Sequence, residues 1–158
     1  MIEVVITADM LVSARDKAVE MGKLRNSILN GAGNIAGFIG ESVAQQVLGG
    51  DIVNTMDYDL VLNDGLKLDV KTKQTSVKPL PTYSCSIAAL NTKQNCDYYC
   101  FVRVKNDFSV GWYLGVYDKQ QYFEDAVFLE KGTVDDSNGY VVKSDCYNIP
   151  ISKLKETP

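Results

Sequence analysis

Two helical patterns open the chain. After an extended lead-in at residues 2–7, apolar residues recur at helical spacing from about Asp9 into the mid-twenties. This first stripe consists of Leu11, Ala14, Ala18, Met21 and Leu24. A second stripe predicts a helix over about 34–48, with apolar positions at Ile35, Phe38, Ile39, Val43, Val47 and Leu48. We expect Asn30-Gly31-Ala32-Gly33-Asn34 to separate the two helices and Gly49-Gly50 to end the second.

The hydrophobic period then changes from helix to strand. Residues 58–62 and 66–71 alternate around Asn63-Asp64-Gly65, a sequence typical of a hairpin turn. Three further strands are expected, at 83–89, 98–104 and 110–117, followed by a short helix near 119–125 and more strand after 126. The chain has no internal repeat or linker sequence. The pattern predicts one domain, residues 1–158, of the α/β (α+β) class, with helices preceding a mostly β body.

Composition sets limits on the class of protein. Of the 158 residues, 46% are apolar, which is enough for a single buried core. No run of about 18 uncharged apolar residues is present, as a membrane helix would need. The first residues lack the basic start and long apolar run of a signal peptide. We therefore expect a cytoplasmic (intracellular) protein that does not enter a membrane.

Of the residue types that commonly bind metals, the chain has four cysteines but no histidine. The four cysteines are Cys85, Cys96, Cys100 and Cys146, and their spacing lacks the paired pattern of a zinc site. We expect them to be buried, reduced thiols. The chain has no histidine, which excludes Ser-His-Asp and Cys-His catalysis. A hydrolase built from this sequence would have to use carboxylates, lysines and a hard metal ion.

Charge is distributed unevenly along the chain. The net charge of −4 taken alone argues against a nucleic-acid partner. However, residues 67–78 carry four lysines, Lys67, Lys71, Lys73 and Lys78, against the single acid Asp69. Acids outnumber lysines between 118 and 145. A basic face opposite an acidic one is compatible with phosphate binding.

Three charged residues of the expected hairpin fall on one side of it. Successive side chains of a strand alternate between faces, so Asp69 and Lys71 point the same way and Val70 points into the core. Asp59, on the preceding strand, can project toward the same side. Charged residues in strands this apolar need a partner. Clustered carboxylates favour a divalent cation, and oxygen ligands suit Mg²⁺ or Mn²⁺.

The order of these residues resembles a known family. Asp59, followed ten residues later by Asp69-Val70-Lys71, resembles the PD-(D/E)xK nuclease superfamily, with Gly40-Glu41 in the position of the glutamate that this family often carries on the preceding helix. The resemblance covers roughly residues 35–75. Tyr58 replaces the family's proline, and Asp57 competes with Asp59 for the role of the first acid. We prefer Asp59 because a strand continues directly from it.

The resemblance implies a fold and an activity. The fold would be a restriction-endonuclease-like core, a central mixed β-sheet flanked by helices, with the N-terminal helices preceding the catalytic hairpin. The activity would be Mg²⁺- or Mn²⁺-dependent hydrolysis of DNA phosphodiester bonds. Glu41, Asp59, Asp69 and the backbone carbonyl of Val70 would hold the metal ion. Lys71 would orient or deprotonate the attacking water and balance charge in the transition state.

The resemblance also suggests partners. Lys67, Lys73, Gln74 and Lys78 would contact substrate phosphate, although solvated roles explain them equally well. The small size is similar to that of phage-type nucleases of DNA recombination, acting on single-stranded, duplex or branched DNA. The helix at 9–26 could pair two subunits, but packing on its own domain is the preferred interpretation. The alternative function is a non-catalytic module that binds nucleic acid or protein on a nuclease-like fold.

Overall fold

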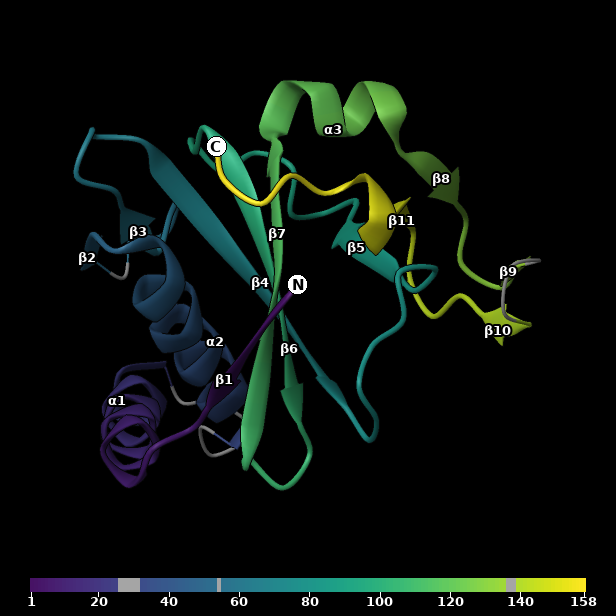
Figure 1. Ribbon diagram of the computed structural model, residues 1–158. Coiled ribbons are helices and arrows are strands. Elements are labelled where there is room, and N and C mark those ends of the chain that lie inside the picture. Colours follow the sequence, from purple (N-terminus) through teal and green to yellow (C-terminus); the bar gives the residue numbers. More distant parts are fainter. Residues whose placement is uncertain (26–31, 54, 136–138) are drawn as a thin grey trace.

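The computed structural model describes residues 1–25, 32–53, 55–135 and 139–158 (Figure 1). The first part of the chain contains β1 (Ile2–Val5), α1 (Ala8–Arg25), α2 (Ala32–Leu48), β2 (Asp51–Ile52), β3 (Leu60–Val61), β4 (Lys67–Thr75) and β5 (Ser84–Ala88). The second part contains β6 (Tyr98–Lys105), β7 (Val110–Asp118), α3 (Lys119–Asp125), β8 (Val127–Leu129), β9 (Val134–Asp135), β10 (Tyr140–Val141), β11 (Cys146–Pro150) and a 3-10 turn, η1 (Ile151–Lys153).

A curled mixed sheet forms the centre of the molecule. Its six strands lie in the order β1-β7-β6-β4-β3-β2. The central strands β4 and β6 run parallel, and the other neighbouring strands of this sheet pair antiparallel. Strands β5, β11 and β8 form a smaller antiparallel sheet, and β9 pairs with β10. The fold is therefore a mixed α and β arrangement, as the sequence pattern predicted.

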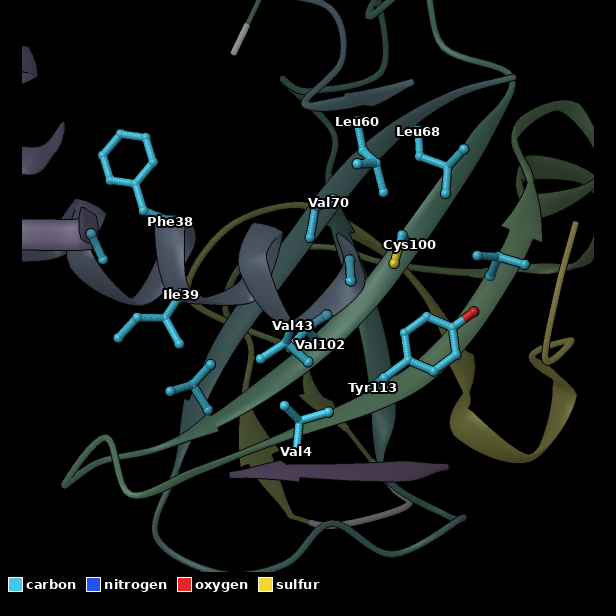
Figure 2. Close-up of a cluster of buried hydrophobic side chains, with 14 of the residues drawn as sticks. Val4, Phe38, Ile39, Val43, Leu60, Leu68, Val70, Cys100, Val102 and Tyr113 are labelled. Atoms are coloured by element: carbon cyan, nitrogen blue, oxygen red, sulfur yellow. The ribbon is translucent and has the colours of Figure 1, made fainter. Parts of the chain in front are cut away.

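Each face of the large sheet has its own core. Helix α2 lies against one face and α1 packs on α2, so that the helices lie on the opposite side of the sheet from β5 and β11 (Figure 1). The core under α2 is largely aliphatic, and Figure 2 shows Val43 of α2 beside Val102 of the sheet. The other core is rich in aromatic residues: Tyr99, Phe101, Trp112, Tyr117 and Tyr122.

Most predicted elements are confirmed, with two differences of extent. Helix α2 begins at Ala32, so the last three residues of the predicted break belong to the helix, while Asn30-Gly31 lies outside the described residues. Packing of the apolar stripe on the sheet favours this longer helix despite the weak propensity of Gly33. Strand β3 is shorter than predicted and begins just after Asp59. Among the described residues, no helix combines the length and the apolar character that a membrane crossing requires.

Candidate active site

The β3–β4 hairpin brings the two predicted aspartates together. The turn is closed by the Leu66 N–H, which donates to Asp64 Oδ1 at 3.1 Å, and Gly65 adopts a left-handed φ of 90°. Leu60 pairs with Leu68, and the Asp59 N–H donates to the Leu68 carbonyl at 2.9 Å. This register sets Asp59 beside Asp69. Asp57, the competing acid, is exposed in the turn that leads into the strand.

The alternation of β4 separates its apolar and charged residues. Leu68 and Val70 belong to the aliphatic core beneath α2. Asp69 and Lys71 project from the opposite face, where Lys71 Nζ lies 2.7 Å from Asp69 Oδ2. Asp69 is only 5% exposed, so this ion pair is withdrawn from bulk solvent. The predicted common orientation of Asp69 and Lys71 is therefore present in the structure.

Asp59 is held by the backbone of its partner strand. Its Oδ2 accepts a hydrogen bond from the Val70 N–H at 2.8 Å. Burial raises the pKa of the Asp59 carboxyl to about 6. The Val70 N–H opposes this rise, the negative charge of Asp69 adds to it, and the positive charge of Lys71 opposes it. The carboxyl group thus occupies a position where negative charge is not fully compensated.

Glu41 approaches the hairpin from α2. Gly40 makes this approach close, because a Cβ atom at that position would collide with Thr72 Oγ1 of β4. Glu41 is 7% exposed, and its Oε2 has no hydrogen-bond partner among the described residues. Burial, followed by the negative charge of Asp59, raises the pKa of Glu41 to about 8, and Lys17 of α1 opposes the rise. We call Glu41, Asp59, Asp69 and Lys71 the acid–lysine cluster.

Tyr99 and Lys17 are neighbours of the acid–lysine cluster that sequence reasoning did not assign to it. The parallel pairing of β4 and β6 places Tyr99 beside Asp69. The Tyr99 ring is fully buried, its centroid lies 6.0 Å from Lys71 Nζ, and its hydroxyl has no hydrogen-bond partner within the described part of the chain. Burial, Cys96 and Asp69 all raise the pKa of this hydroxyl. No local sequence signal reports a parallel pairing across an interval of this length.

The four residues predicted to contact substrate phosphate lie in different places. Lys67 is at the start of β4, with its Nζ 5.1 Å from the ring centroid of Tyr58. Lys73 lies on the same face of β4 as Asp69, and Gln74 is exposed next to it. Lys78 is exposed beyond the far end of β4, where it makes a long 3.9 Å contact with Glu3. The structure does not bring Lys78 to the acids.

The donor atoms of the acid–lysine cluster suit a hard divalent cation in their chemistry. All are carboxylate oxygens, and the buried Oε2 of Glu41 and Oδ2 of Asp69 accept no hydrogen bond from the described residues, although Lys71 forms its ion pair with the latter. Across the described ranges, however, no three acidic or cysteine side chains are grouped with the spacing of a complete metal site. Side-chain rearrangement would be needed to bring the oxygens onto one ion.

The cysteines occupy the positions expected of reduced thiols. Cys85, Cys96 and Cys100 are buried, Cys146 is half-buried, and all four are free. Burial raises the pKa of the Cys96 thiol to about 11, and Asp69 adds to the rise.

Comparisons with known proteins leave the family open. No protein-family model matches this sequence, and no curated protein is significantly similar to it. The geometry of the acid–lysine cluster is therefore the basis for assigning a function.

Proposed function

We propose that this protein is a metal-dependent nuclease that hydrolyses phosphodiester bonds in DNA on a restriction-endonuclease-like core. The observation that carries the proposal is the placement of Asp59, half-buried just before β3, between the Asp69–Lys71 pair of β4 and the buried Glu41 of α2, whose charge interactions include Asp59. The buried Oε2 of Glu41 and Oδ2 of Asp69 accept no hydrogen bond from the described residues. Such groups are costly inside a protein unless a ligand or ion compensates them. The order of these residues also resembles that of the PD-(D/E)xK superfamily.

The acids are suited to hold Mg²⁺ or Mn²⁺. Asp59 and Asp69 would be direct ligands, with the Val70 carbonyl as an additional donor and Glu41 as the third acid. Burial, followed by neighbouring negative charge, raises the pKa values of Asp59 and Glu41, and a bound divalent cation would stabilise their ionised forms. Such an ion would polarise the scissile phosphate and lower the pKa of the attacking water.

Lys71 would act on the reacting groups. Its Nζ lies 2.7 Å from Asp69 Oδ2, next to one of the proposed metal ligands. From there it would donate hydrogen bonds that orient the attacking water and stabilise the negative charge that develops on the phosphate oxygens. In the reaction, water adds to phosphorus, the bond to the leaving oxygen breaks, and that oxygen takes up a proton.

The test compares wild-type protein with Lys71→Met. Both are incubated with single-stranded, duplex and four-way-junction DNA, and with RNA, in Mg²⁺, Mn²⁺ or EDTA. We expect cleavage of DNA that needs the metal ion and that falls by about 10³-fold or more in Lys71→Met, which corresponds to about 4 kcal/mol of transition-state stabilisation. Lys155→Met is the matched control, because it removes an exposed lysine near the edge of β7.

The outcomes separate the enzyme from the alternatives. Cleavage that survives Lys71→Met would place the chemistry elsewhere or in a contaminant. Cleavage of RNA but not DNA would retain the mechanism and change the substrate. Folded wild-type protein that cuts neither nucleic acid in either metal ion would exclude the proposed activity under those conditions.

The second candidate is a binding module that uses the same fold without cleavage. The observation that favours it is the spacing of the acids, which do not form a ready metal-binding group among the described residues. This candidate predicts that DNA binds equally well with and without a divalent ion. A homodimer is a separate expectation; α1, the helix suggested for it, buries Ala14 and Ala18 within its own chain.

A further inference from the structure

A second polar site lies on β4 beyond the acid–lysine cluster. It is a small hollow of about 50 Å³ between β4, β5 and β6. Its lining includes Lys71, Lys73, Ser84, Ser86 and Arg103. We call this the Arg103 hollow.

Two cations without acidic partners face the Arg103 hollow. Lys73 pairs with Arg103 across the parallel strands, so the two positive side chains are neighbours on one face of the sheet. The ion pairs among the described residues are Lys71–Asp69, Lys78–Glu3 and Lys105–Asp107, so that neither Lys73 nor Arg103 meets a carboxylate there. Partial burial, followed by the charge of Arg103, lowers the pKa of Lys73. Adjacent cations of this kind are complementary to an anion.

The Arg103 guanidinium is fixed in place. Arg103 is 8% exposed, one of its terminal nitrogens donates to the Ser84 carbonyl at 3.0 Å, and its centre lies 5.6 Å from the ring centroid of Tyr83. A guanidinium held by a hydrogen bond and a ring is preorganised, so an anion that binds it loses little side-chain entropy. Lys73 is the exposed cation of the pair, and its Nζ lies 6.0 Å from the ring centroid of Tyr140.

The distance from the acid–lysine cluster fits a nucleotide chain. Lys73 follows Lys71 by two residues on the same face of β4, which is about 7 Å along the strand. This is close to the separation of neighbouring phosphates in an extended nucleic-acid strand. A strand with one phosphate at Lys71 would therefore bring an adjacent phosphate to Lys73 and Arg103.

We propose that Lys73 and Arg103 form a binding subsite for the DNA backbone phosphate next to the one that is cut. This inference rests on the proposed nuclease function for the identity of its ligand. Arg103 then has a substrate-binding role, and the DNA strand lies along β4.

The experiment measures DNA binding without cleavage. Fluorescein-labelled single-stranded DNA is titrated with protein in EDTA, and fluorescence anisotropy gives Kd at several salt concentrations. The variants are Lys73→Gln, Arg103→Met and Arg103→Lys, with Lys155→Gln as the charge-matched control. Circular dichroism checks that each variant is folded. If Arg103→Met fails to fold because its hydrogen bond to Ser84 is lost, Lys73→Gln decides the outcome, because its side chain is exposed.

We expect Lys73→Gln and Arg103→Met each to weaken binding about three- to tenfold and to reduce the slope of log K against log salt by about 0.7, the loss of one phosphate contact on a single strand. The effect should be similar for all DNA sequences, because a phosphate contact does not read bases. Arg103→Lys keeps the charge but loses the fixed guanidinium, so its affinity should fall between those of Arg103→Met and wild type. Lys155→Gln should behave like wild type.

Two results would overturn the subsite. One is a folded Lys73→Gln protein with wild-type affinity and salt slope, and the other is a wild-type protein that does not bind DNA. Failure of the nuclease proposal looks different: wild type would bind DNA, with Lys73→Gln weaker, but would cut nothing in Mg²⁺ or Mn²⁺.

Discussion

Two buried tyrosines of the aromatic core, Tyr122 and Tyr99, differ in the hydrogen bonding of their hydroxyl groups. In the cluster around Tyr122, the Tyr122 hydroxyl lies 3.0 Å from the Cys85 carbonyl and 2.8 Å from the Tyr147 carbonyl. The Tyr99 side chain is equally buried, but its hydroxyl has no hydrogen-bond partner among the described residues. The rings of the two tyrosines are in contact, with centroids 5.5 Å apart.

The difference separates a region whose buried polar groups are paired within the protein from the region of the proposed active site. Besides Tyr99, buried atoms that lack hydrogen bonds to described residues belong to Glu41, Asp69 and Thr72, all on α2 or β4, and to Gln94 in the segment before β6. Buried groups of this kind are rare in proteins and mark places that a water, ion or ligand completes. The Tyr122 hydroxyl is paired within the protein, whereas Glu41 Oε2 in the acid–lysine cluster has no hydrogen-bond partner among the described residues.

The largest effect is expected from the acid at the centre of the proposed active site. Asp69→Asn keeps the size of the side chain but removes its charge, and we expect nuclease activity to fall about 10³-fold or more, or about 4 kcal/mol. Gel-based cleavage rates in saturating Mg²⁺ measure the loss. Asp57→Asn is the matched control, because Asp57 is exposed in the turn before β3. Equal activity in Asp69→Asn and wild type would remove Asp69 from the site.

The next effect concerns stability in EDTA. The pKa of Glu41 is raised from 4.5 to about 8, so the folded protein retains a proton that the unfolded chain releases above pH 4.5. The free energy of unfolding should therefore decrease as pH rises from about 4.5 to 8 and level off above that. We expect the Glu41 contribution to reach at most about 1.4 kcal/mol for each pH unit of this range and to disappear in Glu41→Gln.

Thermal melts of both proteins across this pH range measure the difference, with Glu20→Gln on the exposed face of α1 as the control. Parallel curves for wild type and Glu41→Gln would contradict burial of an uncompensated acid at this position.

The smallest effect tests the two tyrosines as a matched pair. Tyr122→Phe removes the single hydroxyl proton that the Cys85 and Tyr147 carbonyls share, and it should destabilise the protein by about 1–2 kcal/mol. Tyr99→Phe removes a hydroxyl that has no partner within the described chain, so its melting temperature in EDTA should equal or exceed that of wild type. Differential scanning calorimetry measures both. A larger loss in Tyr99→Phe than in Tyr122→Phe would reverse the comparison between the two regions.

The hairpin could be predicted from the sequence because its signals are local. Alternation over a few residues decides which side Asp69 and Lys71 share, and the Asp64-Gly65 turn decides the register that brings Asp59 beside them. The helical stripe that carries Glu41 is also local. Strand alternation and the turn identify Asp59, Asp69 and Lys71 as candidates, whereas Glu41 becomes a candidate only through the resemblance to the PD-(D/E)xK order.

The surroundings of the cluster depend on contacts between distant segments. Tyr99 and Arg103 reach β4 only because β6 pairs with it in parallel, after an intervening segment that includes β5. Both residues belong to β6, where the run Tyr98-Tyr99-Cys100-Phe101-Val102 before Arg103 is typical of a buried strand. This run does not indicate which strand lies beside it. The start of α2 at Ala32 was likewise decided by packing, against a run of residues that favours a break.

The alignment of Glu41 with Asp59 depends on the close contact between Gly40 of α2 and Thr72 of β4. Gly40 carries no reactive group, yet the clearance between α2 and β4 at Thr72 is too small for a single added carbon atom. Because Glu41 is the next residue, any thickening at this contact would lift its carboxyl group away from Asp59. A variant at Gly40 could keep every acid and the lysine and still lose their alignment. The geometry of the site therefore depends on a residue that takes no part in its chemistry.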